Sequence, residues 1–164
     1  MITQNELCSL LWYDPDTGIF YWRVRKGRPR PWNALVGKPA GTLNDQGYII
    51  IEIANRPYRA HRLAFLYVKG FIPKFIDHEN TNRADNRWKN LRVATRSLNA
   101  ANCMRHSDSA SPYKGVFKKK GKWGAKICIN YKQIYLGSFE TPELAAAAYI
   151  EKAQSIFGEF ARAS

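Results

Sequence analysis

An aspartate followed directly by a histidine stands near the middle of the chain, at Asp77 and His78. A polar stretch follows this pair and leads to two asparagines, Asn90 and Asn99. A carboxylate and a more distant side-chain oxygen can hold a hard divalent cation, and a histidine can take a proton from water. This layout is typical of a site that cleaves phosphodiester bonds with one metal ion. Amide oxygens suit Mg²⁺ or Mn²⁺ better than Zn²⁺.

The residues around this pair predict the elements that must position it. They are a strand at 75–78, a polar loop at 79–90, a second strand at 91–94 and a helix that Thr95 can cap. The helix carries Asn99, with Asn102 on the same face. Adjacent side chains of a strand point to opposite faces. Asp77 and His78 can therefore share one site only where the strand ends or bulges.

A large excess of positive charge bears on the partner of this chain. The chain has 26 lysines and arginines but only 13 acidic residues, which gives a formal net charge of +13. This surplus favours a polyanion such as nucleic acid, with a solvated basic surface as the alternative. Hydrophobic residues make up 45% of the 164 residues, which is enough for a packed core.

Cysteine usage and hydropathy bear on the compartment. The three cysteines form no CxxC pair, so we expect neither a cysteine-ligated zinc site nor a disulfide framework, and a reduced compartment fits. The first residues lack the pattern of a signal peptide, and no apolar run approaches the length of a membrane span. We therefore expect a cytoplasmic protein with no membrane partner.

A second region follows a small, polar stretch at 105–112, which we interpret as a linker. Three short strands are expected after it, and Thr141, Pro142 and Glu143 form a strong helix start. We therefore predict an α+β protein of two domains. The first, at 1–104, holds the metal site and a β-rich segment, and the second, at 113–164, holds the sheet and the helix.

Several segments of the first domain agree in type and spacing with one nuclease family. They are Ala60–Ala64, Gly70–Pro73, Ile76–His78, Asp85–Arg87 and Asn90–Arg92, with Thr95 and Asn99. Together they resemble the HNH endonucleases of phages and group I introns. The resemblance implies a ββα-metal fold in which His78 is the general base, Asp77 and Asn99 are the metal ligands, and Asn90 fixes the histidine strand through backbone hydrogen bonds. Many relatives have histidine at the last position, where this chain has Asn99.

The second domain carries another resemblance, through the segments Ser111–Val116, Lys122–Ile127, Tyr135–Phe139, Thr141–Tyr149 and Phe157–Arg162. They look like the plant ethylene-response-factor (Apetala-two type) DNA-binding domain. This implies a three-stranded antiparallel sheet packed on one helix, with the outer sheet face in the major groove of DNA. The plant domains carry arginines on this face, and lysines in their place predict weaker sequence discrimination.

The DNA-binding candidates fall in both domains. In the second domain they are Lys114, Lys118, Lys119, Lys122, Trp123, Lys126 and Tyr135. Strand alternation leaves open whether Trp123 or Lys126 lies on the exposed face, and core packing is the alternative for Trp123. In the first domain, Arg87, Arg92 and Arg96 are candidates for phosphate contacts, with solvated charge as the alternative.

These observations predict a metal-dependent endonuclease of the homing type that acts on double-stranded DNA with one Mg²⁺ or Mn²⁺ ion. One site per chain favours nicking and a monomer, and no small-molecule substrate is indicated. A phage gene product acting in a bacterial cytoplasm is the expected setting. A non-catalytic DNA-binding or regulatory protein on the same scaffold is the alternative, and RNA binding is a third that no motif favours.

Overall fold

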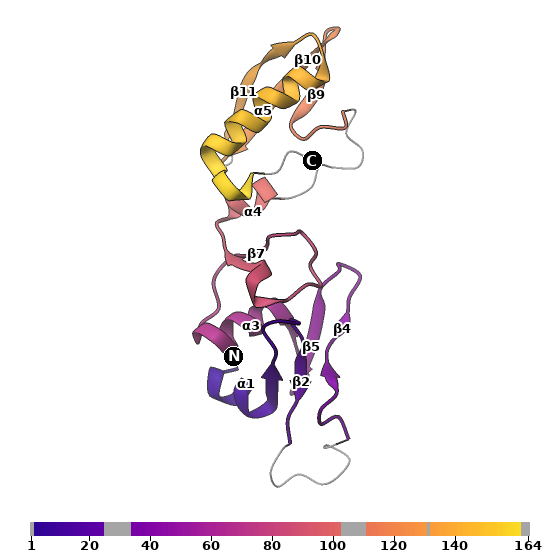
Figure 1. Ribbon diagram of the computed structural model, residues 1–164, viewed down its shortest axis with the longest axis vertical. Helices are drawn as coiled ribbons and strands as arrows, with labels where there is room; N and C mark the ends of the chain where they lie inside the picture. Colours follow the sequence, from indigo (N-terminus) through magenta and orange to yellow (C-terminus); the bar gives the residue numbers. More distant parts are fainter. Residues whose placement is uncertain (1, 25–33, 103–110, 131, 162–164) are drawn as a thin grey trace. The chain divides into compact units, whose positions relative to one another are not determined.

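The structure is a computed structural model that describes residues 2–24, 34–102, 111–130 and 132–161. The chain divides into two compact units, Met1–Val93 and Ala94–Ser164, which Figure 1 draws as ribbons. Each unit has its own clusters of buried apolar side chains. The catalytic pair predicted from the sequence belongs to the first unit, and the predicted helix with Asn99 belongs to the second.

The first unit begins with a short helix and two small antiparallel sheets. Helix α1 (Gln4–Leu10) starts at a capping box, in which Thr3 and Glu6 exchange hydrogen bonds between side chain and backbone. One sheet has the order β1-β2-β3 and the other has the order β4-β5-β6. The strands are β1 (Leu11–Tyr13), β2 (Phe20–Trp22), β3 (Pro39–Ala40), β4 (Thr42–Leu43), β5 (Ile49–Ile53) and β6 (Arg56–Arg59).

A longer helix and a strand pair complete the first unit. Helix α3 (Ala60–Lys69) packs against α1, β5 and β6, and it ends at Gly70, whose φ of 78° only glycine adopts without strain. Strands β7 (Ile76–His78) and β8 (Leu91–Val93) pair antiparallel. The loop between them ends in the short 3₁₀ helix η1 (Trp88–Asn90). The core of the unit includes Phe20, Ile51 and Leu63.

The second unit combines two helices with a three-stranded antiparallel sheet of order β11-β10-β9. Figure 1 shows α5 lying along this sheet, and Ala145 and Ala146 of the helix are buried with Val116 and Ala125 of the strands. Thr141 caps α5 by accepting a hydrogen bond from the N–H of Leu144, as the sequence predicted. The elements are α4 (Arg96–Asn102), β9 (Val116–Lys119), β10 (Lys122–Ile129), β11 (Lys132–Phe139), α5 (Pro142–Phe157) and the 3₁₀ helix η2 (Gly158–Phe160).

The predicted mixture of helices and sheets is confirmed, and two details are added. The boundary between the compact units falls after Val93, so α4 groups with the second unit, whereas the sequence interpretation kept it in the first domain. The short strands β3 and β4 were not predicted. Most of the predicted linker at 105–112 lies outside the described residues. Among the helices that are described, none has the length and apolar composition needed to cross a bilayer.

Candidate catalytic site

The pairing of β7 with β8 sets the positions of Asp77 and His78. Asp77 lies opposite Arg92 and His78 lies opposite Leu91, at the point where β7 ends. Asp77 Oδ2 accepts a hydrogen bond of 2.9 Å from Arg92 Nε, and the two side chains are only 8% and 14% exposed. Directly opposite residues of an antiparallel pair share a face, which brings Asp77 and Arg92 together, and His78 is the last residue of the strand, where it meets the loop.

The His78 ring faces Asn86, which lies in the loop between the two strands. Asn86 Nδ2 donates to the carbonyl of Ala84 at 3.0 Å, so the amide oxygen of Asn86 points to His78 Nε2, 3.4 Å away. An amide oxygen can only accept, and Nε2 must therefore carry the ring proton. This leaves Nδ1 of His78 with the lone pair that a general base needs.

A second histidine packs edge-on against the first. The rings of His61 and His78 have centroids 5.0 Å apart, and the Tyr48 ring lies 5.3 Å from His61 and 6.2 Å from His78. Burial lowers the pKa of His61 to about 3, and the positive potential of His78, Arg59 and Arg62 adds to this shift. His61 is therefore a neutral, packed ring.

Burial also lowers the pKa of His78, although the hydrogen bond with Asn86 and the charges of Asp77 and Asp85 oppose this shift. The charge of Arg83 adds to the lowering. The downward direction of this pKa shift matters for catalysis, because a histidine whose pKa lies below its ordinary value is unprotonated at neutral pH. His78 is therefore in the form that can accept a proton from water.

Asn90 ties the two ends of the loop together. Its backbone carbonyl accepts from the N–H of Glu79 at 2.9 Å, and its Oδ1 accepts from the N–H of Asn80 at 3.0 Å. Its Nδ2 donates to the carbonyl of Asp85 at 2.8 Å. A single buried side chain thus satisfies backbone groups on both sides of the loop. The role of Asn90 in fixing the histidine strand, which the family resemblance implied, stays a prediction.

The loop is further supported by the hairpin of β1 and β2. The Tyr13 hydroxyl donates to the carbonyl of Asn86 at 2.6 Å, and the N–H of Trp88 donates to the carbonyl of Pro15 at 2.9 Å. Gly18 approaches so closely that an added Cβ would lie 2.3 Å from the nitrogen of Arg87. No local pattern in the sequence shows which distant loop a turn will contact.

Asn99 and Asn102 lie on α4 in the second unit, where Thr95 Oγ1 accepts from the N–H of Leu98 at 3.2 Å. The pairing of Asn99 with Asp77 as metal ligands therefore stays a prediction. Within the described residues, no group of three or more histidine, cysteine or acidic side chains could hold a metal ion. In the first unit Asp77 offers a carboxylate, which is the ligand type that Mg²⁺ uses together with several retained waters.

Two of the three first-domain arginines predicted to contact phosphate form salt bridges with aspartates of the first unit. Arg87 donates from its guanidinium to both carboxylate oxygens of Asp85, and this hydrogen bonding lowers the pKa of Asp85 to about 2. Arg92 is held by Asp77. Arg96 is exposed in the first turn of α4. Phosphate binding by Arg87 or Arg92 would have to compete with these ion pairs.

The strand register of the second unit divides the predicted DNA-binding residues between two sheet faces. Val116 and Ala125 are buried with α5, and their neighbours Lys118 and Trp123 lie opposite each other on that same face. The other face carries Phe117, Lys119, Lys122, Lys126 and Tyr135, and we call it the outer face. Of the two alternatives that alternation left open, Lys126 is therefore the residue on the outer face.

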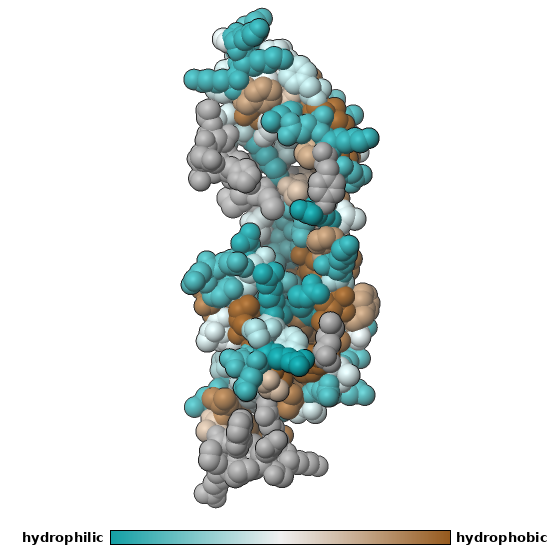
Figure 2. All heavy atoms as spheres, turned by 180° about the vertical axis from the view of Figure 1, so that it is seen from behind, coloured by the Kyte–Doolittle hydropathy of each residue, from teal (hydrophilic) through white to brown (hydrophobic). Residues whose placement is uncertain are grey.

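Lysines and aromatic rings alternate on the outer face. Lys119 Nζ lies 4.1 Å from the centre of the Tyr135 ring and donates to its hydroxyl at 3.0 Å, and Lys126 Nζ lies 5.2 Å from the Phe117 ring. Lys122 pairs with Glu140. Figure 2 shows hydrophilic side chains projecting from the end of the second unit that holds the β9–β10 turn. Lys114 differs from these, because its Nζ donates to the carbonyls of Ala100 and Ala101.

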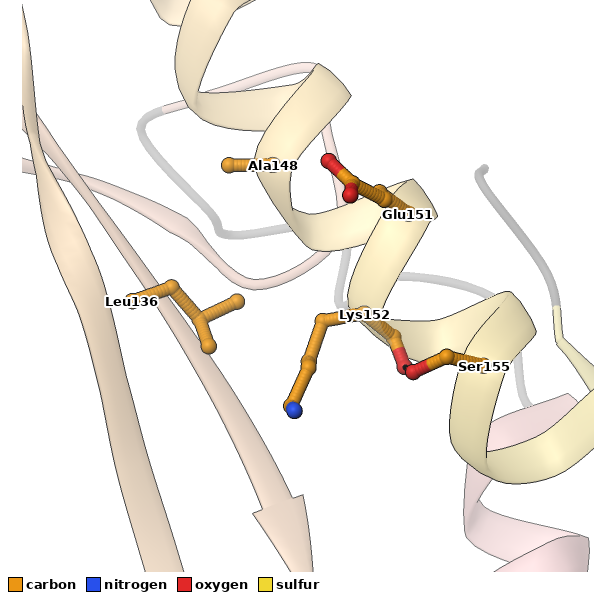
Figure 3. A pocket seen from close by; sticks show the side chains of 5 residues that line it. All are labelled: Leu136, Ala148, Glu151, Lys152 and Ser155. Carbon is orange, nitrogen blue, oxygen red and sulfur yellow. Dashed lines mark hydrogen bonds between the residues drawn. The ribbon is translucent and has the colours of Figure 1, made fainter.

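A shallow pocket lies between β11 and α5 in the second unit. Figure 3 shows Leu136 on the strand facing Ala148, Lys152 and Ser155 on the helix, with Glu151 also on its rim. The amine of Lys152 extends into the space between helix and strand. The lining resembles the ordinary edge of a helix packed on a sheet, and we place no chemistry there.

Comparison with known proteins identifies one family. A family model described as HNH endonuclease matches residues 58–101, which include β7, the loop, β8 and most of α4. A protein of Acanthamoeba polyphaga mimivirus, described as uncharacterized HNH endonuclease L560, is 33% identical over 131 residues. That alignment covers 77% of this chain and 67% of the relative. No solved structure matches the chain significantly. The family match and this relative show that the chain belongs to the HNH endonuclease family.

Proposed function

We propose that this HNH endonuclease hydrolyses phosphodiester bonds of double-stranded DNA in a reaction that depends on Mg²⁺ or Mn²⁺, and that it is a nicking enzyme of the homing type. The observation that carries the proposal is the environment of His78. Its ring is buried, its Nε2 is directed at an amide oxygen, and burial keeps it neutral. These features prepare Nδ1 to accept a proton at neutral pH.

In the proposed reaction, Nδ1 of His78 takes a proton from a water molecule whose oxygen attacks the phosphorus. The bond from phosphorus to the 3′ oxygen breaks, leaving a 5′ phosphate and a 3′ hydroxyl. Asn86 holds the ring and its tautomer, and Asn90 holds the loop that carries Asn86. Asp77, with Asn99 as the predicted second ligand, would hold a divalent ion, and such an ion would neutralise charge on the phosphate and on the departing oxygen.

The ion pair of Asp77 with Arg92 fits this proposal. Arg92 Nε binds Oδ2 of Asp77, and the salt bridge orients the carboxylate on its strand. A carboxylate held in one rotamer loses less entropy when it binds a cation. One such site within the described residues would cut one strand in each encounter with DNA.

The metal requirement provides the first test. Purified full-length protein should convert supercoiled plasmid to nicked circles with Mg²⁺ or Mn²⁺, and EDTA should stop the reaction. Asp77→Ala should raise the metal concentration for half-maximal cleavage roughly tenfold or more, because it removes an oxygen ligand. Asp45→Ala, which removes an exposed carboxylate of the same unit, is the matched control. If DNA binds but no metal supports cleavage, the chain is the non-catalytic DNA-binding protein instead.

We also propose that the outer face of the second unit binds DNA. Lys119, Lys126 and Tyr135 are exposed there, and the lysines lie against aromatic rings that limit their motion. Aromatic rings and cations on one sheet face suit both base contacts and phosphate contacts. Lysines offer charge without the two-pronged guanine recognition of arginine, so modest sequence preference is expected.

Salt dependence provides the test of this second proposal. The double substitution of Lys119 and Lys126 by glutamine should weaken binding to duplex DNA in EDTA. It should also flatten the plot of log affinity against log salt by about 0.9 for each phosphate that the protein no longer neutralises. Lys152→Gln, which removes a lysine of the same unit from α5, is the control. An equal slope for the double variant and this control would show that the outer face does not bind phosphate.

A further inference from the structure

Two arginines of the first unit lie over one aromatic ring beside the catalytic pair. The Cζ atom of Arg59 is 4.3 Å from the centre of the Tyr48 ring, and the Cζ atom of Arg83 is 5.2 Å from it. Arg59 ends β6, and Arg83 lies in the loop between β7 and β8. The same ring contacts His61 and His78. Both guanidinium groups are therefore one aromatic ring away from the general base.

A preformed turn holds these groups in place. Asn44 Oδ1 accepts from the N–H groups of Gln46 and Tyr48, which fixes the turn before β5. Arg83 donates to the backbone carbonyl of Gln46 at 3.0 Å, and Arg59 donates to the Oε1 of the same residue at 3.2 Å. The two cations are thus oriented by a ring contact and by a hydrogen bond each, although both are exposed.

This pair differs from two other arginines near the site. Arg87 and Arg92 are neutralised by Asp85 and Asp77. In the part of the chain that the structure covers, neither Arg59 nor Arg83 forms a salt bridge with a carboxylate. Two like charges beside the same ring repel each other, and an anion between or beside them would relieve that repulsion.

The chemistry of the pair suits a phosphate diester. A guanidinium has five N–H donors, and each of these two uses one in the hydrogen bond to Gln46. Stacking on a ring leaves the N–H edges free to meet the oxygens of a phosphate. Two oriented guanidinium groups can therefore bind both non-bridging oxygens without first ordering their own side chains.

We propose that Arg59 and Arg83, held on Tyr48, form a clamp for the DNA backbone phosphate at the cleavage position or next to it. The clamp places the scissile bond at His78. This inference rests on the proposed nuclease function and adds substrate-positioning residues to it. The clamp reads no base, so it acts equally on every DNA sequence.

Arg59→Gln and Arg83→Gln in the full-length protein test the clamp. Each substitution should lower kcat/KM for nicking of supercoiled plasmid about tenfold to a hundredfold, the range for loss of a hydrogen bond to a charged group. Arg83→Lys should retain part of the activity, because it keeps the charge and loses the planar fork. Arg56→Gln removes the same charge from an exposed position at the start of β6, and it should behave like the wild type.

The outcomes separate this inference from the proposed function. A loss specific to Arg59 and Arg83, with unchanged thermal unfolding, supports the clamp. If both glutamine variants nick as fast as Arg56→Gln while His78→Ala is slow, Arg59 and Arg83 do not position the phosphate, and the proposed nuclease function is retained. If the wild-type protein nicks no plasmid with any divalent ion, the proposed function fails and the clamp falls with it.

Discussion

Replacing His78 with alanine should slow DNA nicking by roughly 100-fold or more, because the reaction loses its general base. Binding to duplex DNA in EDTA should be almost unchanged, since the ring is only 6% exposed and contributes little surface to a ligand. The measurements are single-turnover nicking rates and binding isotherms for the two proteins side by side. Equal rates for the wild type and His78→Ala would remove His78 from the mechanism.

Two further readouts sharpen this test. Removing a buried ring leaves a cavity, so thermal unfolding of His78→Ala has to be measured at the assay temperature. Asn86→Ala should also slow nicking, by less than His78→Ala, because it removes the group that directs Nε2 and not the base itself. An Asn86 variant as slow as the His78 variant would indicate collapse of the whole loop.

Gly18→Ala should destabilise the first unit by roughly 3 kcal/mol or more. Its φ of +75° disfavours a side chain, and the added methyl would lie 2.3 Å from Arg87 nitrogen and 2.4 Å from the Asn86 carbonyl carbon. Backbone atoms cannot move aside as a side chain can. The expected result is a lower urea midpoint of unfolding, together with slower nicking, because the displaced loop carries Asn86.

Gly37→Ala is the matched control for this prediction. Gly37 has nearly the same φ, +74°, and an added Cβ would meet no atom within 4 Å. It should cost only the strain of the left-handed backbone, roughly 1 kcal/mol. If the two variants unfold at the same urea concentration, the close approach of the hairpin to the loop does not contribute to stability.

The sequence predicted the elements around Asp77 and His78 well, because polarity changes abruptly there. The apolar residues before Asp77 and the polar run after His78 mark where β7 ends, and the helix start at Thr141 is equally clear in its cap and proline. Such signals are local, so they can be read without knowledge of the fold. The role proposed for Asn90 came only from the family resemblance.

Contacts between distant segments could not be read in this way. The Tyr13 hydroxyl donates a hydrogen bond to a carbonyl 73 residues further along the chain. Arg83 donates one to the carbonyl of Gln46, 37 residues before it. The composition of these segments does not indicate which distant segment each one contacts. In the second unit, alternation alone could not place Trp123 and Lys126, and the register of β10 with β11 shifts between Ala125 and Lys126. A shift of one residue reverses the face that each side chain occupies.

The support of the loop by the β1–β2 hairpin bears on how this nuclease can be divided or transplanted. The segment that matches the family model begins at residue 58. Its loop is nevertheless contacted by three residues that precede this segment, namely Tyr13 through its hydroxyl, Pro15 through its carbonyl and Gly18 through its backbone. We therefore expect that the matching segment does not fold into a stable site by itself. A minimal version, or a graft onto another protein, has to bring the N-terminal hairpin along with it.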